Sequence, residues 1–520
     1  MNDAIDIRAS QARWWALAAI ALVLIAVGLD VTVLSVALPT LAAALRASET
    51  DLQWFSSGYA LTLAAGMLPA GMLGDRYGRK KVMLAALAIF ATGSVACAIS
   101  PSPAAFIVAR AAVGLAGAAL VVMALSVITV IFSEAERPRA VGIWAAANFL
   151  ALPIGPILGG WMLSHAWWGW VFLVNVPVAL AGALAVTVLV PESRAANRPR
   201  VDAVGIIGVS AGLVALTYGL IEAGQRGWTD AAPVAEMAAG LALLTAFFLW
   251  EAHLTRTPGG QPLVDLSLFA VPAFTWGVIL AALGVMGMIG VLFTMPQYFQ
   301  GVLGVDAQAS GIRLLPIIVG LVLGAVPADR VAARVGPRLT VTAGLLILAL
   351  ALGLGSTTSL SSSALFVATW MGLAGLGMGL GLATASSAAL NAVPADRSGV
   401  GSGLMQALQK VGAPFGSAIL GSVLVNAYQA QLRLGSLPPA AAALARGSVF
   451  GGVAVARALH SPALLVNVRE AFVHGMDVAL LVSIAFVGLG TILALVFMPG
   501  RRGAQAASTR TVAASGPSVA

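Results

Sequence analysis

Ten residues between two long apolar segments read Gly71-Met72-Leu73-Gly74-Asp75-Arg76-Tyr77-Gly78-Arg79-Lys80. A connection this short between two helices of membrane length must lie at one membrane face, and its clustered cations place that face in the cytoplasm. The glycines allow the backbones to approach closely where the chain reverses. The stretch therefore predicts a cytoplasmic gate between two membrane-spanning helices. The predicted gate residues are Gly71, Gly74, Asp75, Arg76, Gly78, Arg79 and Lys80.

The composition excludes a soluble globular domain. Of 520 residues, 60% are hydrophobic and only 9% are charged, a balance that soluble domains do not show. The net charge of +8 does not indicate nucleic-acid binding, because the cations lie in short connections between apolar segments, where they orient a chain in a lipid bilayer. The first apolar segment is too long for a signal peptide, so it is predicted to be a retained helix.

The residues that could carry enzyme chemistry form no recognisable pattern. The four histidines are scattered, and the single Cys97 permits no disulfide within the chain. The chain also lacks the G-x-x-x-x-G-K-[ST] motif, so ATP is not the expected energy source. We therefore predict a protein that is not an enzyme, that needs no cofactor or metal, and that draws its energy from an ion gradient.

Fourteen apolar segments are long enough to cross a bilayer, which takes about 20 residues each. They begin near Trp14, Leu52, Val82, Ala104, Ala140, Trp168, Ala203, Ala231, Phe274, Gly311, Leu339, Ala364, Gly399 and Ala471. With the N-terminus inside, the short outer connections hold only Arg46 and Arg226. The inner connections hold Arg76, Arg79, Lys80, Lys81, Arg137, Arg139, Arg194, Arg198, Arg200, Arg256, Arg330, Arg334, Arg338 and Arg397. This asymmetry predicts a multi-pass protein of the inner (plasma) membrane with both termini in the cytoplasm.

The two halves of the chain contain a repeat. The stretch at 71–76 is echoed at 325–330, and both join the second and third helices of a set of six if two helices within 203–250 are an insertion. Two six-helix halves are a transporter architecture with the substrate site at their interface. The predicted fold is therefore all-α and membrane-integral, with two six-helix halves plus two inserted helices, fourteen in total. The predicted segments are 1–13 (cytoplasmic N-terminus), 14–190 (N-terminal half), 191–270 (linker and inserted helices), 271–498 (C-terminal half, with an extracytoplasmic loop of short amphipathic helices at 428–470) and 499–520 (disordered cytoplasmic tail).

Two opposite charges lie within the predicted spans at similar depth. Asp30 is roughly 12 Å below the outer end of the first span, and Arg110 is roughly 10 Å below the outer end of the fourth. Ionisable groups inside a membrane are costly and usually functional. A carboxylate beside a cation stays ionised, and it loses that support when the cation moves away. We therefore predict that Asp30 and Arg110 couple transport to protons; the alternative is a static ion pair that links two helices.

Several motifs resemble those of the fourteen-helix drug:H+ antiporter family within the major facilitator superfamily. The stretch at 71–80 is similar to the superfamily's loop between helices 2 and 3. Residues 29–39 resemble the helix-1 motif L-D-x-T-V-x-N-V-A-L-P, with Ser35 in place of the asparagine. Residues 110–114 resemble the helix-4 motif R-x-x-Q-G, with Val113 in place of the glutamine. Further similar stretches are Phe172–Pro177, Pro296–Gln300 and Arg397–Gly416.

One more similarity concerns the direction of transport. Gly155-Pro156-Ile157-Leu158-Gly159-Gly160 resembles the antiporter motif G-P-x-x-G-G, in which the proline kinks the helix and the glycines allow close packing. In the family this motif is linked to export and to the prevention of leak. The alternative is a packing kink without directional meaning. The resemblance implies Gly155, Pro156, Gly159 and Gly160 as motif residues, and alternating access in which protons enter as substrate leaves.

The predicted thirteenth span contains an unexpected cation. Lys410 is roughly 18 Å from the inner end of that span, near the midplane. It either lines the substrate cavity, is neutral, or pairs with backbone carbonyl groups. Other polar and aromatic residues are candidates for the same cavity, although aromatic residues on helices are more often packing residues. The predicted cavity residues are Trp54, Tyr59, Asn148, Phe149, Phe293, Tyr298, Gln406, Gln409 and Lys410.

Together these features predict a monomeric secondary active transporter that exports amphipathic drugs or an endogenous metabolite in exchange for protons. Its expected partners are a small amphipathic substrate, protons and the lipid bilayer, without nucleic acid or ATP. The alternative is a proton-coupled importer or facilitator of a small metabolite. The residues do not identify the substrate.

Overall fold

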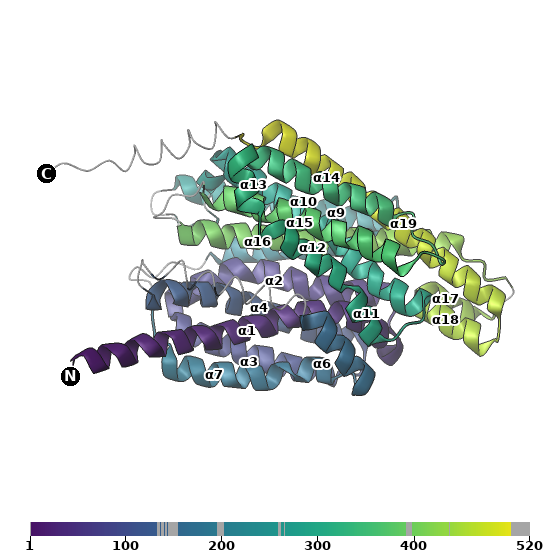
Figure 1. The fold of residues 1–520 in the computed structure, drawn as a ribbon, viewed down its shortest axis with the longest axis horizontal. Helices are drawn as coiled ribbons and strands as arrows, with labels where there is room; N and C mark the ends of the chain where they lie inside the picture. Colours follow the sequence, from purple (N-terminus) through teal and green to yellow (C-terminus); the bar gives the residue numbers. More distant parts are fainter. Residues whose placement is uncertain are drawn as a thin grey trace.

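The computed structural model describes residues 2–132, 136, 140, 143, 154–194, 202–257, 260, 262–264, 266–391, 398–435 and 437–500. Their secondary structure is helical throughout. The helices run along the longest axis of the molecule, with the N-terminal half below the C-terminal half in Figure 1. The start of the first helix and the end of the last lie at the same end of the bundle. We call this end the terminal face and the opposite end the distal face.

The N-terminal half forms a bundle with its own apolar core. It contains α1 (Asn2–Leu45), α2 (Glu49–Tyr77), α3 (Arg79–Ala98), α4 (Pro103–Ile131), the helical residues 154–165, α6 (Trp170–Leu173) and α7 (Asn175–Leu189). Phe55, Phe106 and Phe172 lie in this core, where the Phe106 ring is tilted against Phe55 and edge-on to Phe172. Two of its helices begin at a serine cap: the Ser48 hydroxyl caps α2 in a reciprocal box with Asp51, and the Ser102 hydroxyl caps α4.

The C-terminal half is a second bundle with a second core, which includes Trp370 and Phe472. It contains η1 (Leu266–Ala270), α10 (Pro272–Gln297), the π-helix η2 (Tyr298–Val302), α11 (Ala307–Arg313), α12 (Leu315–Ala325), α13 (Ala328–Val335), α14 (Pro337–Gly355), α15 (Ala364–Asn391), α16 (Ser398–Gln431), α17 (Pro439–Gly447), α18 (Val449–Ala458) and α19 (Pro462–Phe497). Most of the buried apolar residues of each half thus belong to a cluster of their own.

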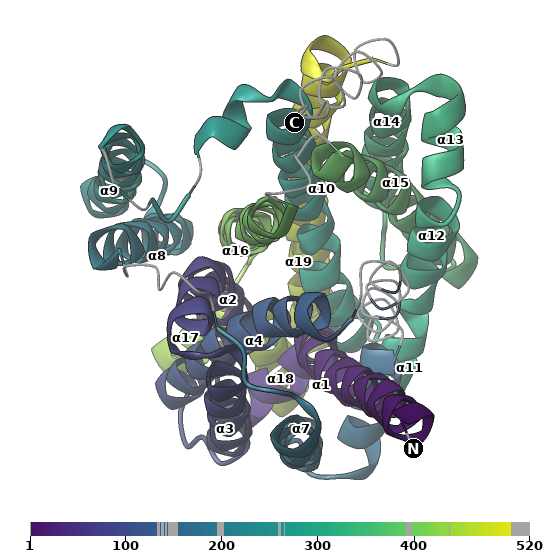
Figure 2. The same ribbon diagram turned by 90° about the vertical axis from the view of Figure 1, so that its left-hand side faces the viewer.

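Between the halves in sequence are α8 (Ala203–Arg226) and α9 (Ala231–Arg256). They pack against each other and lie to one side of the bundle, with α8 next to α2 and α16 (Figure 2). Ser422 and Asn426 of α16 donate hydrogen bonds to backbone carbonyls of α8, including that of Leu220 at 2.7 Å. The inserted pair is therefore attached to the bundle through α8.

Twelve of the described helical segments are long and apolar enough to cross a membrane. The all-helical membrane fold is thus confirmed, whereas the predicted number of fourteen spans is not. One difference is α2, which has polar residues such as Gln53 and Ser57 near its start and is not among the twelve. The other is the predicted fifth span, of which residues 140, 143 and 154–165 are described.

Helix ends also differ from the expected boundaries. The first helix begins at Asn2 instead of near Trp14, and the last begins at Pro462 instead of near Ala471. Both extensions are less apolar than the spans they precede, so a hydrophobicity pattern does not detect them. Residues 428–470 contain the end of α16, the short helices α17 and α18, and the start of α19. Of the predicted tail at 499–520, only residues 499 and 500 are described.

Candidate functional site

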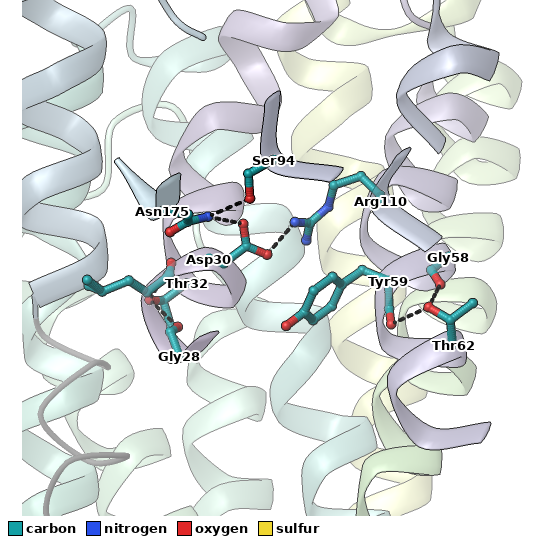
Figure 3. A network of polar contacts seen from close by, with 10 residues as sticks. Gly28, Asp30, Thr32, Gly58, Tyr59, Thr62, Ser94, Arg110 and Asn175 are labelled. Atoms are coloured by element: carbon teal, nitrogen blue, oxygen red, sulfur yellow. Dashed lines mark hydrogen bonds and ion pairs between the residues drawn. The ribbon is translucent and has the colours of Figure 1, made fainter. Parts of the chain in front are cut away.

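Four helices of the N-terminal half converge on one buried carboxylate. Arg110 of α4 donates a hydrogen bond from Nη1 to Asp30 Oδ2 on α1, forming an ion pair in which each side chain is only 1% exposed. Asn175, the first residue of α7, donates from Nδ2 to the other carboxylate oxygen, Asp30 Oδ1, at 3.1 Å. The same amide nitrogen is 3.4 Å from the Ser94 hydroxyl on α3. Figure 3 shows these contacts. The structure therefore brings together the two charges that the sequence placed at similar depth.

An aromatic ring covers the guanidinium of this pair. The Arg110 carbon Cζ lies 4.2 Å from the centroid of the Tyr59 ring on α2, within cation–π distance. Gly114 permits this approach, because a Cβ there would collide with Thr62 and with the backbone carbonyl of Tyr59. The Tyr59 hydroxyl and Arg110 Nε are buried without a hydrogen-bond partner in the described part of the chain. On the side that faces α2, these two groups could therefore still form hydrogen bonds.

The departure from the helix-4 motif has a packing role. Val113 is fully buried, and its side chain fits against Gly93 of α3, where a Cβ would lie 2.8 Å from Val113 Cγ2. An apolar side chain here tightens the contact between α3 and α4. The polar partner of the carboxylate is instead Asn175, which sequence analysis had noted only as part of a similar stretch.

The predicted antiporter motif packs beside the carboxylate. Its glycines allow the helical residues 154–165 to touch α1: a Cβ on Gly155 would collide with the Thr32 hydroxyl, and one on Gly159 would lie 2.8 Å from Val33. These α1 residues are two and three positions after Asp30. The motif therefore contacts the same turn of α1 that carries the acidic side chain.

The same motif also reaches the C-terminal half. A Cβ on Gly160 would lie 2.7 Å from the carbonyl oxygen of Ala307, and one on Gly311 would collide with the carbonyl oxygen of Pro156. Close backbone contact thus joins the motif helix to α11 near the distal face. The motif lies at a contact between the two halves as well as against α1.

The predicted gate stretch forms a compact turn at the terminal face. Gly78 has φ 114°, a conformation that favours glycine. Asp75 pairs with Arg79 at 2.9 Å, and a Cβ on Gly74 would collide with Met123 of α4, while one on Gly71 would meet Val122 at 3.6 Å. Arg76 lies over the ring of Tyr77 at 5.6 Å.

The gate stretch also contacts the end of α7 and the segment after it. The Lys80 ammonium donates to the Thr187 carbonyl at 2.7 Å, and the Arg79 backbone N–H donates to the Ser193 carbonyl at 2.9 Å. A Cβ on Gly78 would collide with the Glu192 carboxylate. These contacts are made to α7 and to the segment that follows it, and none of them is made to a helix of the C-terminal half.

The predicted cavity residues are dispersed. Tyr59 lies at the ion pair, and Phe293 is buried in the core of the N-terminal half although it belongs to α10. Trp54 faces Tyr218 of α8, with ring centroids 6.0 Å apart. Tyr298 is fully buried in the C-terminal core and donates to the Ser359 carbonyl at 2.8 Å. Trp54 and Tyr298 are therefore not brought to the ion pair.

The remaining cavity candidates are on α16 or outside the described residues. Gln409 donates to the Ser386 hydroxyl of α15 at 2.9 Å, and Gln406 is half-buried. Asn148 and Phe149 lie outside the described residues, as does the side chain of Lys410. In the part of the chain that the structure describes, no three His, Cys, Asp or Glu side chains form a group that could hold a metal ion.

The two halves meet through polar contacts near the distal face. Ser57 of α2 and Ser417 of α16 share a hydrogen bond of 2.5 Å. Gln300 donates to the Val36 carbonyl at 3.1 Å, and Gln297 donates to the Glu49 carboxylate at 2.9 Å. Sequence analysis missed Glu49, because it precedes the apolar part of α2 and resembles an ordinary first-turn acid. The structure is closed at this end.

The comparison with known proteins fits this arrangement. The model of the Major Facilitator Superfamily matches residues 20–417. The chain belongs to this superfamily. It is 33% identical over 496 residues to the tetracenomycin C resistance and export protein of Streptomyces glaucescens, covering 93% of this chain and 91% of that protein. It is 32% identical over 474 residues to the multidrug efflux pump LfrA of Mycolicibacterium smegmatis, covering 90% and 93%.

Among solved structures, the fold is similar to that of a bacterial homologue of the human lysosomal transporter Spinster in an inward-facing, unoccupied conformation. The TM-score is 0.66 at 17% sequence identity, and the match covers 96% of this chain and 98% of that one. The protein is therefore a multi-pass membrane transporter of the major facilitator fold. Its relatives are drug and antibiotic efflux proteins in a superfamily of transporters, not enzymes.

Proposed function

We propose that the protein is a proton-coupled exporter of small amphipathic compounds, drugs or an endogenous metabolite, and that it works as a monomer by alternating access. Export is supported by the relatives, which are named for export and efflux. Proton coupling is supported by one observation above all: the buried carboxylate of Asp30 is paired with Arg110. A buried ion pair is weak evidence for a purely stabilising role, because desolvation offsets much of the attraction.

Protonation changes what holds α1 in place. When Asp30 is ionised, Arg110 and the Asn175 amide both donate to it. A proton on the carboxylate cancels its attraction for the guanidinium, and Arg110 is then held mainly by the Tyr59 ring. The contact between α1 and α4 therefore weakens, while the antiporter motif stays packed against Thr32 and Val33 of α1. A shift of α1 would be transmitted to the contact between the two halves.

Alternating access gives the order of events. A proton reaches Asp30 from the outside, the protein changes its open face, and the proton leaves to the cytoplasm as Arg110 pairs with the carboxylate again. Substrate occupies the site in the opposite phase of the cycle. Each state binds one ligand better than the other, so the proton gradient drives the substrate outward.

We further propose that fourteen helices cross the membrane, with both termini in the cytoplasm. α2 has 29 residues, so at about 1.5 Å per residue it is long enough to span, and it packs lengthwise on α4. The helical residues 154–165 lie between the inner end of α4 and the distal α6, so the chain must cross once there. The cations of the gate stretch at the terminal face support a cytoplasmic position for that face.

The experiment measures uphill transport without knowledge of the natural substrate. Purified protein is reconstituted in proteoliposomes, a proton gradient is imposed, and accumulation of ethidium is followed with and without a protonophore. We expect gradient-driven accumulation that Asp30→Asn abolishes while the protein remains folded and monodisperse. Asp230→Asn is the matched control, because Asp230 is an exposed helix cap. Undiminished uphill transport by Asp30→Asn would refute the proton role, and gradient-driven movement in the opposite direction would identify an importer.

A further inference from the structure

A second carboxyl group is buried where the two halves meet. Glu49, the first residue of α2, is 3% exposed, and its Oε1 accepts a hydrogen bond from Gln297 Nε2 of α10 at 2.9 Å. Gln297 is fully buried, and the same amide nitrogen donates to the Phe293 carbonyl at 3.2 Å. This contact crosses from one half to the other at the distal face. It must break when the halves separate there.

The neighbours of Glu49 do not neutralise it. On its own segment, Asp51 is engaged with Ser48 in the capping box, and Arg46 is exposed in the preceding turn. On α16, the buried Tyr428 interacts electrostatically with Glu49, but it donates its hydroxyl to the carbonyl of Ala445. On α8, the titratable residues at this end, Glu222 and Arg226, pair with each other at 2.7 Å. In the described part of the chain, no Lys, Arg or His forms an ion pair with Glu49.

This contact contains buried hydrogen-bond acceptors that have no donor. Glu49 Oε2, Gln297 Oε1 and Gln53 Oε1 are all buried without a hydrogen-bond donor among the described residues. Gln53 is one turn after Glu49 on α2, so their side chains share one helix face. A proton on the carboxyl group turns one of these acceptors into a donor and removes a buried negative charge. Both changes favour the protonated form in the closed state.

We propose that Glu49 is a second proton-binding site, which takes up a proton when the distal face closes and releases it when the halves separate there. The proposal rests on the proposed alternating-access function. Because Glu49 lies at the distal face, the proton returns to the side from which it came. It therefore adds nothing to the energy of transport; instead, it makes closure depend on the external pH. Since closing binds a proton, acid outside stabilises the closed distal face and alkali favours its opening.

The test reports accessibility and needs neither substrate nor transport. In a Cys97→Ser background, Ser417→Cys places a thiol at the buried contact with Ser57. Intact cells are treated with a membrane-impermeant maleimide over a series of external pH values. Labelling of the exposed loop residue in Ser361→Cys corrects for the intrinsic pH dependence of thiol reactivity. We expect corrected labelling at Ser417→Cys to rise with external pH, by at most about tenfold per pH unit for one proton.

Three variants decide the assignment. Glu49→Gln should label slowly at every pH, because an amide of the same size supplies the donor permanently. Asp51→Asn, a carboxyl-to-amide change two residues away, should keep the pH dependence. Gln297→Glu should move the rise to higher pH, because two adjacent carboxyl groups resist joint ionisation. The Gln297→Glu variant also tests the site if the Glu49→Gln variant does not fold.

The outcomes separate this proposal from the proposed function. If Asp30→Asn abolishes uphill transport but leaves the pH dependence of labelling intact, Glu49 acts independently of the transported proton. A wild-type labelling rate that does not change with pH would overturn the proposal, whatever the transport assay shows. A labelling rate that still depends on pH in Glu49→Gln but no longer does in Asp30→Asn would overturn the proposal too, because it would assign the effect to Asp30.

Discussion

Arg110 on α4 donates a hydrogen bond to Asp30 on α1 at a place from which solvent is excluded, since 1% of each side chain is exposed. Two charges so placed depend on each other. Each alone would be an uncompensated charge in a medium of low dielectric constant, and together they leave the protein sensitive to a single proton. This relationship leads to a prediction about stability that is separate from transport.

Removing one member of the pair should cost more than removing both. We expect Arg110→Met to lower the stability of the detergent-solubilised protein by about 3 to 5 kcal/mol, because it leaves the carboxylate without its cation. The double variant with Asp30→Asn should recover most of that loss but should not transport uphill. Thermal unfolding followed by intrinsic fluorescence measures the first effect. Equal melting temperatures for the single and double variants would show that the two residues are not coupled.

The terminal-face gate should control opening and not substrate recognition. Asp75 pairs with Arg79 beside the left-handed Gly78, against the segment that follows α7. Asp75→Asn should change the rate at which Gln406→Cys is labelled from the cytoplasmic side, in a Cys97→Ser background, and should slow transport of every substrate. Lys81→Gln, at an exposed neighbouring position, is the control. An altered range of substrates with unchanged labelling would contradict this role.

The close contact of the antiporter motif with α11 predicts a leak. A side chain at Gly311 would collide with the backbone carbonyl of Pro156, so Gly311→Val should push the halves apart at the distal face. Overpacking of this kind costs about 1 to 3 kcal/mol, enough to shift a two-state equilibrium by roughly five- to a hundredfold. We expect faster labelling of Ser417→Cys and faster proton leakage from proteoliposomes. Gly488→Val is the control, because no atom lies within 4 Å of a Cβ there. Equal proton leakage in the two variants would show that the motif is a packing kink that does not prevent leak.

Sequence reasoning reached some of these relationships and not others. Asp30 and Arg110 stand out because charges are rare in apolar spans, and helix geometry alone gives their depth. Asn175 and Glu49 do not stand out. An amide inside a helix carries no charge, and an acid in the first turn of α2 reads as an ordinary helix-start residue. Their roles depend on which helices face each other, which is a tertiary property.

The same limit explains the dispersed cavity candidates and the span count. Trp54 and Tyr298 are large aromatic residues near helix ends, but packing directs one to α8 and the other into the C-terminal core. Hydrophobicity alone does not identify α2 as a span, because this helix carries polar residues such as Gln53 and Ser57, which are buried against other helices. A helix that packs on both sides, as α2 does against α4 and α16, needs less apolar surface than one that faces lipid.

The preference of the transporter for substrates of a given charge is expected to depend on Lys410, which lies on α16. Asp30 is the deep acid of the predicted cavity, and it is already paired with Arg110. The cavity therefore balances at most one positive charge on the substrate, and only when Asp30 is ionised and released by Arg110. A second substrate cation would face Lys410 without a partner, at a cost of about 3 kcal/mol, or about a hundredfold in affinity. We therefore expect better resistance to the monocation tetraphenylphosphonium than to the dication methyl viologen.

Lys410→Glu should reverse this preference, because it replaces a repulsive charge with an attractive one. Resistance of an efflux-deficient host to the two cations is compared between wild type and variant, with expression matched by immunoblot. Lys81→Glu makes the same charge change at an exposed position in α3 and should leave the ratio unchanged, which controls for the overall charge of the protein. If wild type protects equally against both cations, or if the ratio is the same in Lys410→Glu, the ammonium group of Lys410 does not face the substrate and discrimination between the two cations arises elsewhere in the cavity.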